Sequence, residues 1–565
     1  MLTETQKRYL IYILAAILLI IVALFIMIQI QEPTLTDNLS DLLEQQFAQP
    51  KMDQAIQIAG VRLHADTLLY HFYRQREFQS AWFDERGPRN IADSLTQALR
   101  QADLDGLNPN DYHSRVLDSL LTKARTDLKM LVPVSIQQWF NIELLLTDAL
   151  LVYSQHLLSG RLDPETIDPE WLPRKPERDV IALLLDAIDS GRIQATLKSL
   201  LPDFPCYAKL RSEMALYKSI AAKDQATQIP PGEKMKKGDR GKRVAALSER
   251  LILFGDLNER PAALNSEYDD TLESAVRRFQ ERSGLKIDGE VGAGTLAALN
   301  TPAAEQIRKI AVNMERWRWL PKQLGDRYIL VNIAAFNLDV VEQGQTILSM
   351  PVVVGKDYRQ TPVFSSQMTY LVFNPYWHVP PTIATEDILP EAKKNPQYLV
   401  KRNIEVLRSW NDMTVLDPFS INWAKYNKDN LPFVFRQPPG RDNALGRIKF
   451  MFPNKYDVYI HDTPQRSHFA LPQRAYSSGC IRVESPIELA TYVLQGNPRW
   501  NREAIIKALD ETKDFTVRLP QPIQVHIFYC TSYVDERGWL HFREDIYQRD
   551  AAVIKALQEA GVLRE

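Results

Sequence analysis

The hydrophobic period of the sequence changes near Arg327, and this change limits the folds that the chain can adopt. Between about residues 40 and 220, apolar residues recur at spacings of three and four, which is typical of amphipathic helices. From Arg327 onward, runs such as Tyr328–Ile333 and Leu338–Val341 are apolar or alternating and are separated by turn residues, as in strands. A chain of 565 residues is too long for a single core. We therefore expect a multidomain α+β protein, helical first and β-rich later.

The N-terminal segment Tyr9–Ile30 is a long apolar run, interrupted only by Gln29. Its length is sufficient to cross a bilayer as a helix, and no small-residue cleavage site follows it. Lys7 and Arg8 precede the run, and no Lys or Arg occurs from there through Pro50. The positive-inside rule therefore predicts a cytoplasmic N-terminus over residues 1–8, a single transmembrane anchor over 9–30, and the rest of the chain outside the cytoplasm.

Charge and cysteine content narrow the class of protein. The chain has 68 Lys and Arg against 70 Asp and Glu, a formal charge of −2. A nucleic-acid-binding protein would carry a basic excess, so we expect no nucleic-acid partner. The three cysteines, Cys206, Cys480 and Cys530, form no disulfide framework. A bridge between Cys206 and Cys530 stays open, although the two lie in different expected domains.

Composition divides the middle of the chain into segments. Residues 31–39 have the composition of a short polar tether, and the helical pattern of residues 40–220 follows. Residues 223–237 have the composition of a linker. Glycines break short helices across residues 235–301, which predicts a small helical unit.

Two acidic residues in the helical part, Glu143 and Asp148, are spaced like a pair of catalytic carboxylates. Acidic residues on an amphipathic helix are usually solvated. We interpret both as solvated structural residues and expect no chemistry there.

The stretch from His461 to Val483 contains the strongest candidate for catalysis. Cys480 lies in the small-residue turn Ser477-Ser478-Gly479-Cys480, downstream of His461. A thiol is a weak nucleophile until it ionises, and a neighbouring imidazole makes ionisation easier. Gly479 permits a tight backbone, so main-chain N–H groups near the thiol could face a developing oxyanion. Spacing alone leaves open a packed thiol beside a surface imidazole.

These residues resemble the active-site signature of the YkuD-type L,D-transpeptidases, a His followed by a Ser-x-Gly-Cys turn. The ending Cys-Ile-Arg-Val resembles the large scaffold-bearing YcbB branch. Residues 235–301, with their glycines, aromatics and Asp-Gly pair in order, resemble a three-helix peptidoglycan-binding domain. The segments Trp139–Ala149 and Gly160–Pro164 resemble the scaffold domain of the branch. One departure is Ser478, which occupies a position where many members have His.

The resemblance implies the arrangement of the remaining chain. A mixed β-sandwich-like catalytic domain should cover residues 325–506. Residues 381–449, which from composition form a long irregular loop with ordered aromatics, should be a capping insert over the cleft. A C-terminal extension over residues 520–565 should pack against the catalytic domain.

It also implies site residues, with Cys480 as nucleophile and His461 as proton donor and acceptor, ahead of His468 and His378. The candidates for the oxyanion site or for substrate binding are Gly479, Ser478, Tyr459, Trp377 and Arg482. Tyr459 and Trp377 are alternatively packed aromatics, and Arg482 alternatively braces the fold through Glu484 or Glu488. Arg436 and Lys449 are further partners for a substrate carboxylate, with surface solvation as the default for each.

The activity so implied is a transpeptidation through a cysteinyl thioester. The donor bond would be the meso-diaminopimelate–D-alanine bond of a tetrapeptide stem, and the amine of a second diaminopimelate would accept, giving a 3→3 cross-link. Carbapenems would acylate the enzyme. Partners would be donor and acceptor stems, the inner membrane, glycan-strand synthases and carboxypeptidases, with the catalytic domain in the periplasm. No cofactor and no metal is expected, because Cys480 and His461 lack further ligands at metal spacing.

Other functions stay open from the sequence. Water or a protein amine as acceptor would make the chain a carboxypeptidase or a protein-to-wall attachment enzyme. With a vestigial signature, it would be a non-catalytic wall-binding scaffold.

Overall fold

The computed structural model describes residues 4–29, 33–47, 56–167, 179–221, 223–224, 228–259 and 266–563. The last residue of the predicted anchor, Ile30, lies outside these ranges, as do residues 31–32 of the tether and 225–227 of the linker. Helix α1 covers Glu4–Gln29. Over the described ranges, no helix meets the length and apolarity that a membrane span requires, so the anchor stays a prediction.

The chain forms two compact units. The first comprises Met1–Asp103, Leu107–Leu158 and Glu177–Leu201, and the second comprises Leu104–Gly106, Ser159–Pro176 and Pro202–Glu565.

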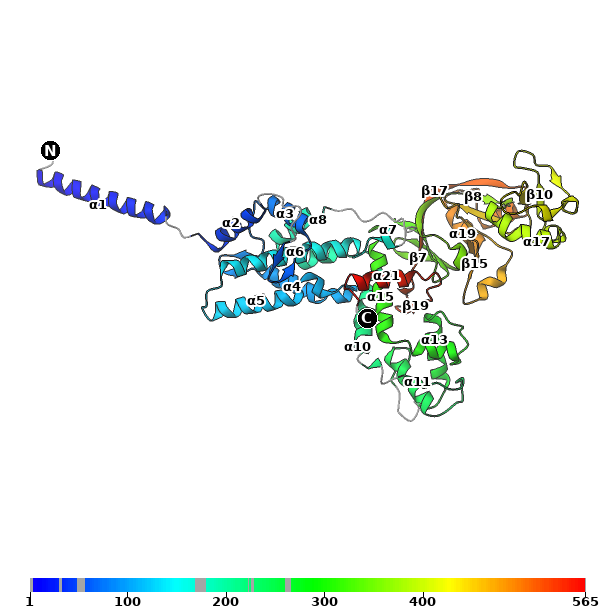
Figure 1. Cartoon of the computed structure of the whole chain (residues 1–565), viewed down its shortest axis with the longest axis horizontal. Helices are drawn as coiled ribbons and strands as arrows, with labels where there is room; N and C mark the ends of the chain where they lie inside the picture. The colour runs from blue at the N-terminus through cyan, green and yellow to red at the C-terminus, as the bar shows by residue number, and fades with distance from the viewer. Residues whose placement is uncertain are drawn as a thin grey trace. The chain divides into compact units, whose positions relative to one another are not determined.

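The first unit is a helical domain built around α6 (Ile136–Ser159), and its helices are drawn in blue to cyan in Figure 1. Nearly every residue of α6 from Trp139 to Leu158 is buried, as expected of a helix that is apolar all round. The surrounding helices are α2 (Leu35–Phe47), α3 (Asp66–Gln75), α4 (Asn90–Arg100), α5 (Ser114–Lys129), α8 (Val180–Ser190) and α9 (Ile193–Leu200). The helical prediction for this region is confirmed.

Our interpretation of Glu143 and Asp148 as solvated residues is wrong, because both are 0% exposed on α6. The carboxylate of Glu143 accepts hydrogen bonds from the hydroxyls of Tyr73 and Ser80 and from the N–H groups of Ala81 and Trp82. Asp148 accepts from the N–H groups of residues 64 and 65 and lies 2.7 Å from His113 Nε2. Buried carboxylates need such partners, and these fasten neighbouring loops to α6.

The second unit contains the predicted small helical domain and the β-rich domain. Helices α11 (Lys242–Leu253), α13 (Asp270–Arg282) and α14 (Ala293–Leu299) make up the small domain, and α15 (Ala303–Arg318) leads from it to the sheet. The predicted apolar positions form its core, with Val244, Leu247, Leu251, Val276 and Phe279 all buried. Helix α10 (Pro205–Ala221) packs along α15.

Nine strands form one mixed sheet in the order β15-β7-β16-β14-β13-β8-β17-β5-β6. Because β6 also pairs with β7, the sheet closes on itself, so the expected sandwich is one continuous curled sheet. The strands are β5 (Arg327–Asn332), β6 (Asn337–Glu342), β7 (Gln345–Gly355), β8 (Phe364–Phe373), β13 (Ile448–Met451), β14 (Ile460–His461), β15 (Ala475–Ser477), β16 (Ile481–Val483) and β17 (Phe515–Phe528). The prediction of a β-rich C-terminal domain is confirmed.

The C-terminal extension differs from our expectation, because its first strand is internal to the sheet. Strand β17 pairs with β8 on one side and β5 on the other. An inner strand supplies backbone hydrogen bonds on both sides, so the main sheet runs past residue 506 to Phe528. Strands β18 (Ser532–Val534) and β19 (Leu540–Phe542) and helix α21 (Arg549–Glu559) follow.

The expectation of an irregular loop over residues 381–449 is wrong, because this insert is folded. Strands β9 (Trp377–His378), β10 (Glu405–Leu407), β11 (Val415–Leu416) and β12 (Val434–Gln437) form a separate sheet in the order β11-β10-β12-β9. In the core of the insert, Trp423 and Phe435 pack against the short helices α16 (Pro381–Ile383), α17 (Leu389–Lys394) and α18 (Gln397–Lys401). The insert ends before β13, so Lys449 belongs to the main sheet.

Candidate active site

Two parallel strands bring the predicted histidine and cysteine together. Strand β14 pairs with β16, with His461 opposite Arg482, and the Ile481 N–H donates to the Tyr459 carbonyl at 3.0 Å. Cys480, the residue before β16, therefore lies opposite Tyr459. Paired residues of parallel strands and alternate residues of one strand share a face, so all four side chains lie on one face.

A third strand adds a cation to this face. In the antiparallel pairing of β13 with β14, Lys449 lies opposite His461. Its Nζ is 3.8 Å from the centre of the Tyr459 ring. Burial lowers the pKa of Lys449, and the charge of a Cys480 thiolate would raise it. The sequence suggested Lys449 as a partner for a substrate carboxylate with surface solvation as the default, because its strand could not be assigned.

The imidazole of His461 is buried and neutral. Its Nδ1 lies 2.5 Å from the Asp462 carbonyl oxygen, so Nδ1 carries the proton and Nε2 is the free base. Burial, with the nearby charge of Arg482, lowers the pKa of His461 to about 3. At neutral pH the ring is uncharged, so it can act as a proton donor toward a leaving group only after it has taken up a second proton.

The backbone after His461 is fixed by the side chain of Asp462. Its carboxylate accepts the N–H groups of Arg447 at 2.9 Å and Thr463 at 2.7 Å. Gly446 lies against this carboxylate with φ +62°, and a Cβ there would overlap it. The orientation of the imidazole thus depends on a glycine from the end of the insert.

The thiol of Cys480 is partly buried, and its Sγ lies 3.9 Å from the Asp457 carbonyl oxygen. Burial raises the pKa of the Cys480 thiol above its usual range. Hydrogen bonds from Tyr459 and the charges of Lys449 and Arg482 oppose this rise. Burial therefore favours the neutral form of both the Cys480 thiol and the His461 imidazole.

Ser477 shapes the turn that carries the thiol. Its hydroxyl accepts the Gly479 N–H at 3.1 Å and donates to the Cys480 carbonyl at 2.5 Å. The Gly479 N–H is therefore engaged, and the Cys480 N–H is the better oxyanion donor. Gly479 itself has φ +111°, a conformation that L-residues rarely adopt. Our prediction named Ser478 instead; that residue is exposed and accepts from Arg359 at 3.1 Å.

Arg482 does not brace the fold in either way that we expected. Its guanidinium donates to Gln465 Oε1 at 2.6 Å, whereas Glu488 pairs with Arg502. The Nε of Arg482 is buried and has no hydrogen-bond partner in the part of the chain that the structure describes. A half-buried guanidinium with an unused donor beside the thiol suits a substrate carboxylate.

The small sheet of the insert carries the predicted aromatics, but its predicted charged residue, Arg436, is already paired. Trp377 pairs in register with Gln437 and is half-buried against the insert core. His378 is exposed, and its ring centre is 4.9 Å from that of Trp410. Arg436 donates to Glu405 at 2.8 Å, which makes it a weaker carboxylate partner. His468 lies in a short helical turn, and its ring centre is 4.7 Å from that of Tyr476, with the two rings tilted by 32°.

One arginine joins the insert to the thiol turn. Arg359 pairs with Glu386 at 2.7 Å and Asp387 at 2.5 Å, and it also contacts Ser478. Elsewhere, all three cysteines are free, so the Cys206–Cys530 bridge that the sequence left open is not formed. Across the described ranges, no group of three or more His, Cys, Asp or Glu residues is arranged to hold a metal ion.

Comparison with known proteins assigns the three regions. Residues 326–500 match the family described as "L,D-transpeptidase catalytic domain", residues 67–214 match "Scaffold domain", and residues 240–299 match "Putative peptidoglycan binding domain". A "Putative L,D-transpeptidase" of Haemophilus influenzae is 36% identical over 248 residues, which cover 44% of this chain and 49% of that protein. The match thus spans about half the length of the curated relative.

Solved structures of two L,D-transpeptidases were also matched. The one from Xylanimonas cellulosilytica is 16% identical, with 53% of this chain and 99% of that chain covered and a TM-score of 0.16. The one from Mycobacterium smegmatis is 14% identical, with 36% and 58% covered and a TM-score of 0.16. At such TM-scores these structures carry no argument about the fold.

Proposed function

Because the chain carries an L,D-transpeptidase catalytic domain, a peptidoglycan-binding domain and a scaffold domain, we propose that it is a peptidoglycan L,D-transpeptidase that forms 3→3 cross-links. Cys480 is the nucleophile and His461 carries the proton. The observation that supports this most is the parallel pairing of β14 with β16, in which His461 lies opposite Arg482 and Cys480 directly precedes β16.

Acylation starts from the neutral pair. As Sγ of Cys480 attacks the carbonyl carbon of the donor, the thiol proton passes to Nε2 of His461. The oxyanion accepts a hydrogen bond from the Cys480 N–H, and the hydroxyl of Tyr459 lies on the same face. The bond to D-alanine then breaks, and its nitrogen takes the proton from His461. The product is a thioester on Cys480 and free D-alanine.

Deacylation reverses the roles of the same groups. The side-chain amine of a second diaminopimelate attacks the thioester carbonyl, and its proton passes to His461. Sγ leaves as a thiolate and recovers that proton, so the enzyme is regenerated without any cofactor. Arg482 and Lys449 supply positive charge for the stem carboxylates on this face.

The proposed location follows from the sequence. The apolar segment 9–30 anchors the chain in the inner membrane, with the N-terminus in the cytoplasm and the catalytic domain in the periplasm. Residues 240–299 hold the glycan or stem while the catalytic domain works on it. Glycan-strand synthases and carboxypeptidases supply the tetrapeptide substrate.

The product spectrum tests this function. The purified full-length protein is incubated with tetrapeptide muropeptides, and the products are identified by mass spectrometry. A cross-linked dimer with release of D-alanine is expected. Tripeptide monomer would instead indicate hydrolysis, and unchanged tetrapeptide would contradict the proposed chemistry.

Two cysteine variants provide the control. Cys480→Ala should abolish turnover and leave binding to sacculi intact. Cys206→Ala removes a thiol outside the site and should keep the wild-type product spectrum. Turnover in Cys480→Ala would mean that the nucleophile is assigned wrongly.

A further inference from the structure

The carbonyl of Gly479 is held by a threonine from a distant loop. Thr361 is fully buried, and its Oγ1 donates to the Gly479 carbonyl at 2.8 Å. The same oxygen accepts the N–H of Gly355 at 2.9 Å. Gly355 ends β7, where it lies in register with Ser477 of β15. The loop from Gly355 to Thr361 is therefore tied to the turn that carries the thiol.

This hydrogen bond fixes the direction of the Cys480 N–H. The peptide bond between Gly479 and Cys480 is trans and planar, so its C=O and its N–H point in opposite directions. Because Thr361 holds the C=O, the N–H points away from Thr361. An oxyanion donor stabilises the transition state most when its direction is set before the reaction.

A tyrosine from the C-terminal segment closes the same loop. The hydroxyl of Tyr547 donates to the Gly355 carbonyl at 2.6 Å and accepts the Thr361 N–H at 3.2 Å. Its side chain is buried. One hydroxyl thus bridges both ends of the loop. Arg549 adds a contact to the middle of the loop, donating to Gln360 Oε1 at 3.0 Å.

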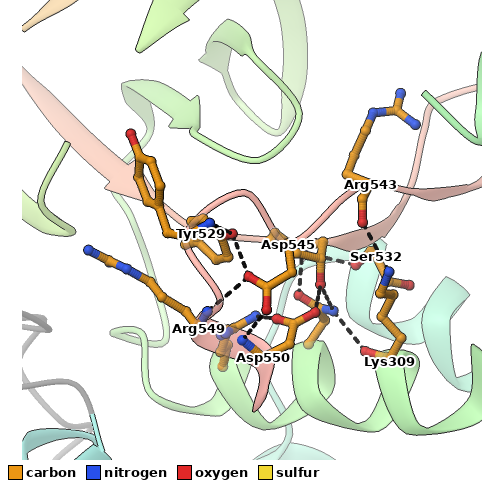
Figure 2. Close-up of polar contacts among 12 residues, drawn as sticks. Lys309, Tyr529, Ser532, Arg543, Asp545, Arg549 and Asp550 are labelled. Carbon is orange, nitrogen blue, oxygen red and sulfur yellow. Dashed lines mark hydrogen bonds and ion pairs between the residues drawn. The ribbon is translucent and has the colours of Figure 1, made fainter. Parts of the chain in front are cut away.

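Tyr547 is itself anchored by the cluster at the start of α21. Its N–H donates to the hydroxyl of Tyr529 at 3.1 Å, and that hydroxyl donates to Asp545 at 2.6 Å. Figure 2 shows Asp545 between Tyr529 and the backbone of Arg549, which donates to it at 2.9 Å. The neighbouring Asp550 forms an ion pair with Arg316 at 2.5 Å. We call this series of contacts, from Thr361 through Tyr547 and Asp545 to Asp550, the relay. It ends at Arg316 on helix α15.

We propose that Thr361 and Tyr547 are positioning residues for acylation. The C-terminal segment fixes the Gly355–Thr361 loop, the loop fixes the Gly479 carbonyl, and the carbonyl aims the Cys480 N–H at the oxyanion. Neither residue touches substrate. This inference rests on the proposed function, since it concerns the oxyanion of the same reaction.

Two rates measured on one protein test the proposal. Acylation by a carbapenem, followed by intact mass, requires an oxyanion donor, whereas alkylation by iodoacetamide requires only the thiol. Thr361→Val keeps the shape and removes the hydroxyl, and it should lose about 10- to 100-fold in acylation rate. Tyr547→Phe should lose about 10-fold, because the backbone contacts of the loop remain. Alkylation should stay within about 3-fold of wild type in both, since no oxyanion forms.

Matched variants separate positioning from packing. Thr361→Ser restores the hydroxyl and should recover acylation. Tyr533→Phe removes another hydroxyl of the C-terminal segment, which contacts Arg543 at 3.0 Å, and should change neither rate. Thermal unfolding of each variant checks that it is folded.

Three results would overturn the inference. A folded Thr361→Val protein that is acylated at the wild-type rate would remove the role of the relay and leave the proposed function standing. Equal loss of acylation and alkylation would mean that the relay only holds the turn together. A wild-type protein whose thiol is alkylated but never acylated would overturn the proposed function and this inference with it.

Discussion

The helical unit and the β-rich domain each bury a histidine, and the two sites differ in how their polar atoms are satisfied. In the helical unit, His113 Nε2 lies 2.7 Å from Asp148, whose other oxygen accepts two backbone N–H groups. In the β-rich domain, His461 hydrogen-bonds to backbone carbonyls, with Nδ1 2.5 Å from the Asp462 oxygen, and within the described ranges no carboxylate pairs with its ring. In a structural cluster the buried polar atoms are hydrogen-bonded to neighbouring protein groups, whereas a reactive site leaves polar atoms available to the substrate.

The largest effect is expected from removing the free base. His461→Gln should lower turnover by about 10²- to 10⁴-fold, the usual contribution of a general base. The same change at His113 should leave turnover per folded molecule near wild type and lower stability instead. Steady-state release of D-alanine, normalised to folded protein by circular dichroism, makes the comparison. Equal losses of turnover at both positions would remove the distinction between the two sites.

The second effect concerns the closed cluster. Glu143→Ala leaves several buried donors without an acceptor and should destabilise the helical unit by about 3 kcal/mol. Glu44→Ala, an exposed acidic change in α2, is the matched control and should cost under about 0.5 kcal/mol. Urea unfolding followed by far-UV circular dichroism measures both. A loss below 1 kcal/mol for Glu143→Ala would mean that its contacts do not hold the unit.

A smaller effect is expected at the cationic part of the site. Arg482→Gln removes a charge that we assign to a stem carboxylate, and KM for the tetrapeptide should rise about 10-fold. Arg436→Gln serves as the comparison, because Arg436 is already paired with Glu405. If KM rises more in Arg436→Gln, the carboxylate lies under the insert and not beside the thiol.

The pH dependence should be the mildest change. Because the pKa of His461 is lowered to about 3, its ring remains a base as the pH falls, so kcat/KM should stay nearly level from about pH 8 down to about pH 5. The thiol, with its raised pKa, should react with iodoacetamide faster as the pH rises through this range and beyond. An acid limb near pH 6.5 in kcat/KM would contradict the neutral pair.

The lowered pKa of His461 also makes the folding stability of the chain depend on pH. The unfolded chain takes up a proton on this imidazole near its ordinary pKa, about 6.5, whereas the folded chain does so only near 3. Folding stability from this group is therefore full above about pH 6.5 and is lost as the pH falls toward about pH 3. His461→Gln should flatten that part of the stability curve, as measured by unfolding in urea at each pH.

The sequence predicted the helical and β-rich parts well, because hydrophobic period reports local structure directly. It also predicted that His461 and Cys480 belong to adjacent rigid elements, and β14 does pair with β16; their catalytic roles stay a prediction. It failed for Glu143 and Asp148, because an amphipathic pattern does not reveal loops that return to cover a carboxylate.

Other features required the tertiary fold. Lys449 reaches the site only through the pairing of β13 with β14, and its strand lay in what looked like a loop. The contact of Thr361 with the thiol turn, and that of Tyr547 with Thr361, join segments far apart in sequence. Likewise β17 is an inner strand only because β8 and β5 flank it.

We propose that Cys480 forms an acyl-enzyme and that His461 carries the proton. The most direct test is the intact mass of the protein mixed with a tetrapeptide donor whose diaminopimelate side-chain amine is blocked, and quenched before an acceptor is added. We predict a mass gain equal to the donor less D-alanine, mapped to the peptide containing Cys480 and absent in Cys480→Ala. A wild-type protein that gains no mass while D-alanine is released, or an adduct that persists in Cys480→Ala, would contradict the account.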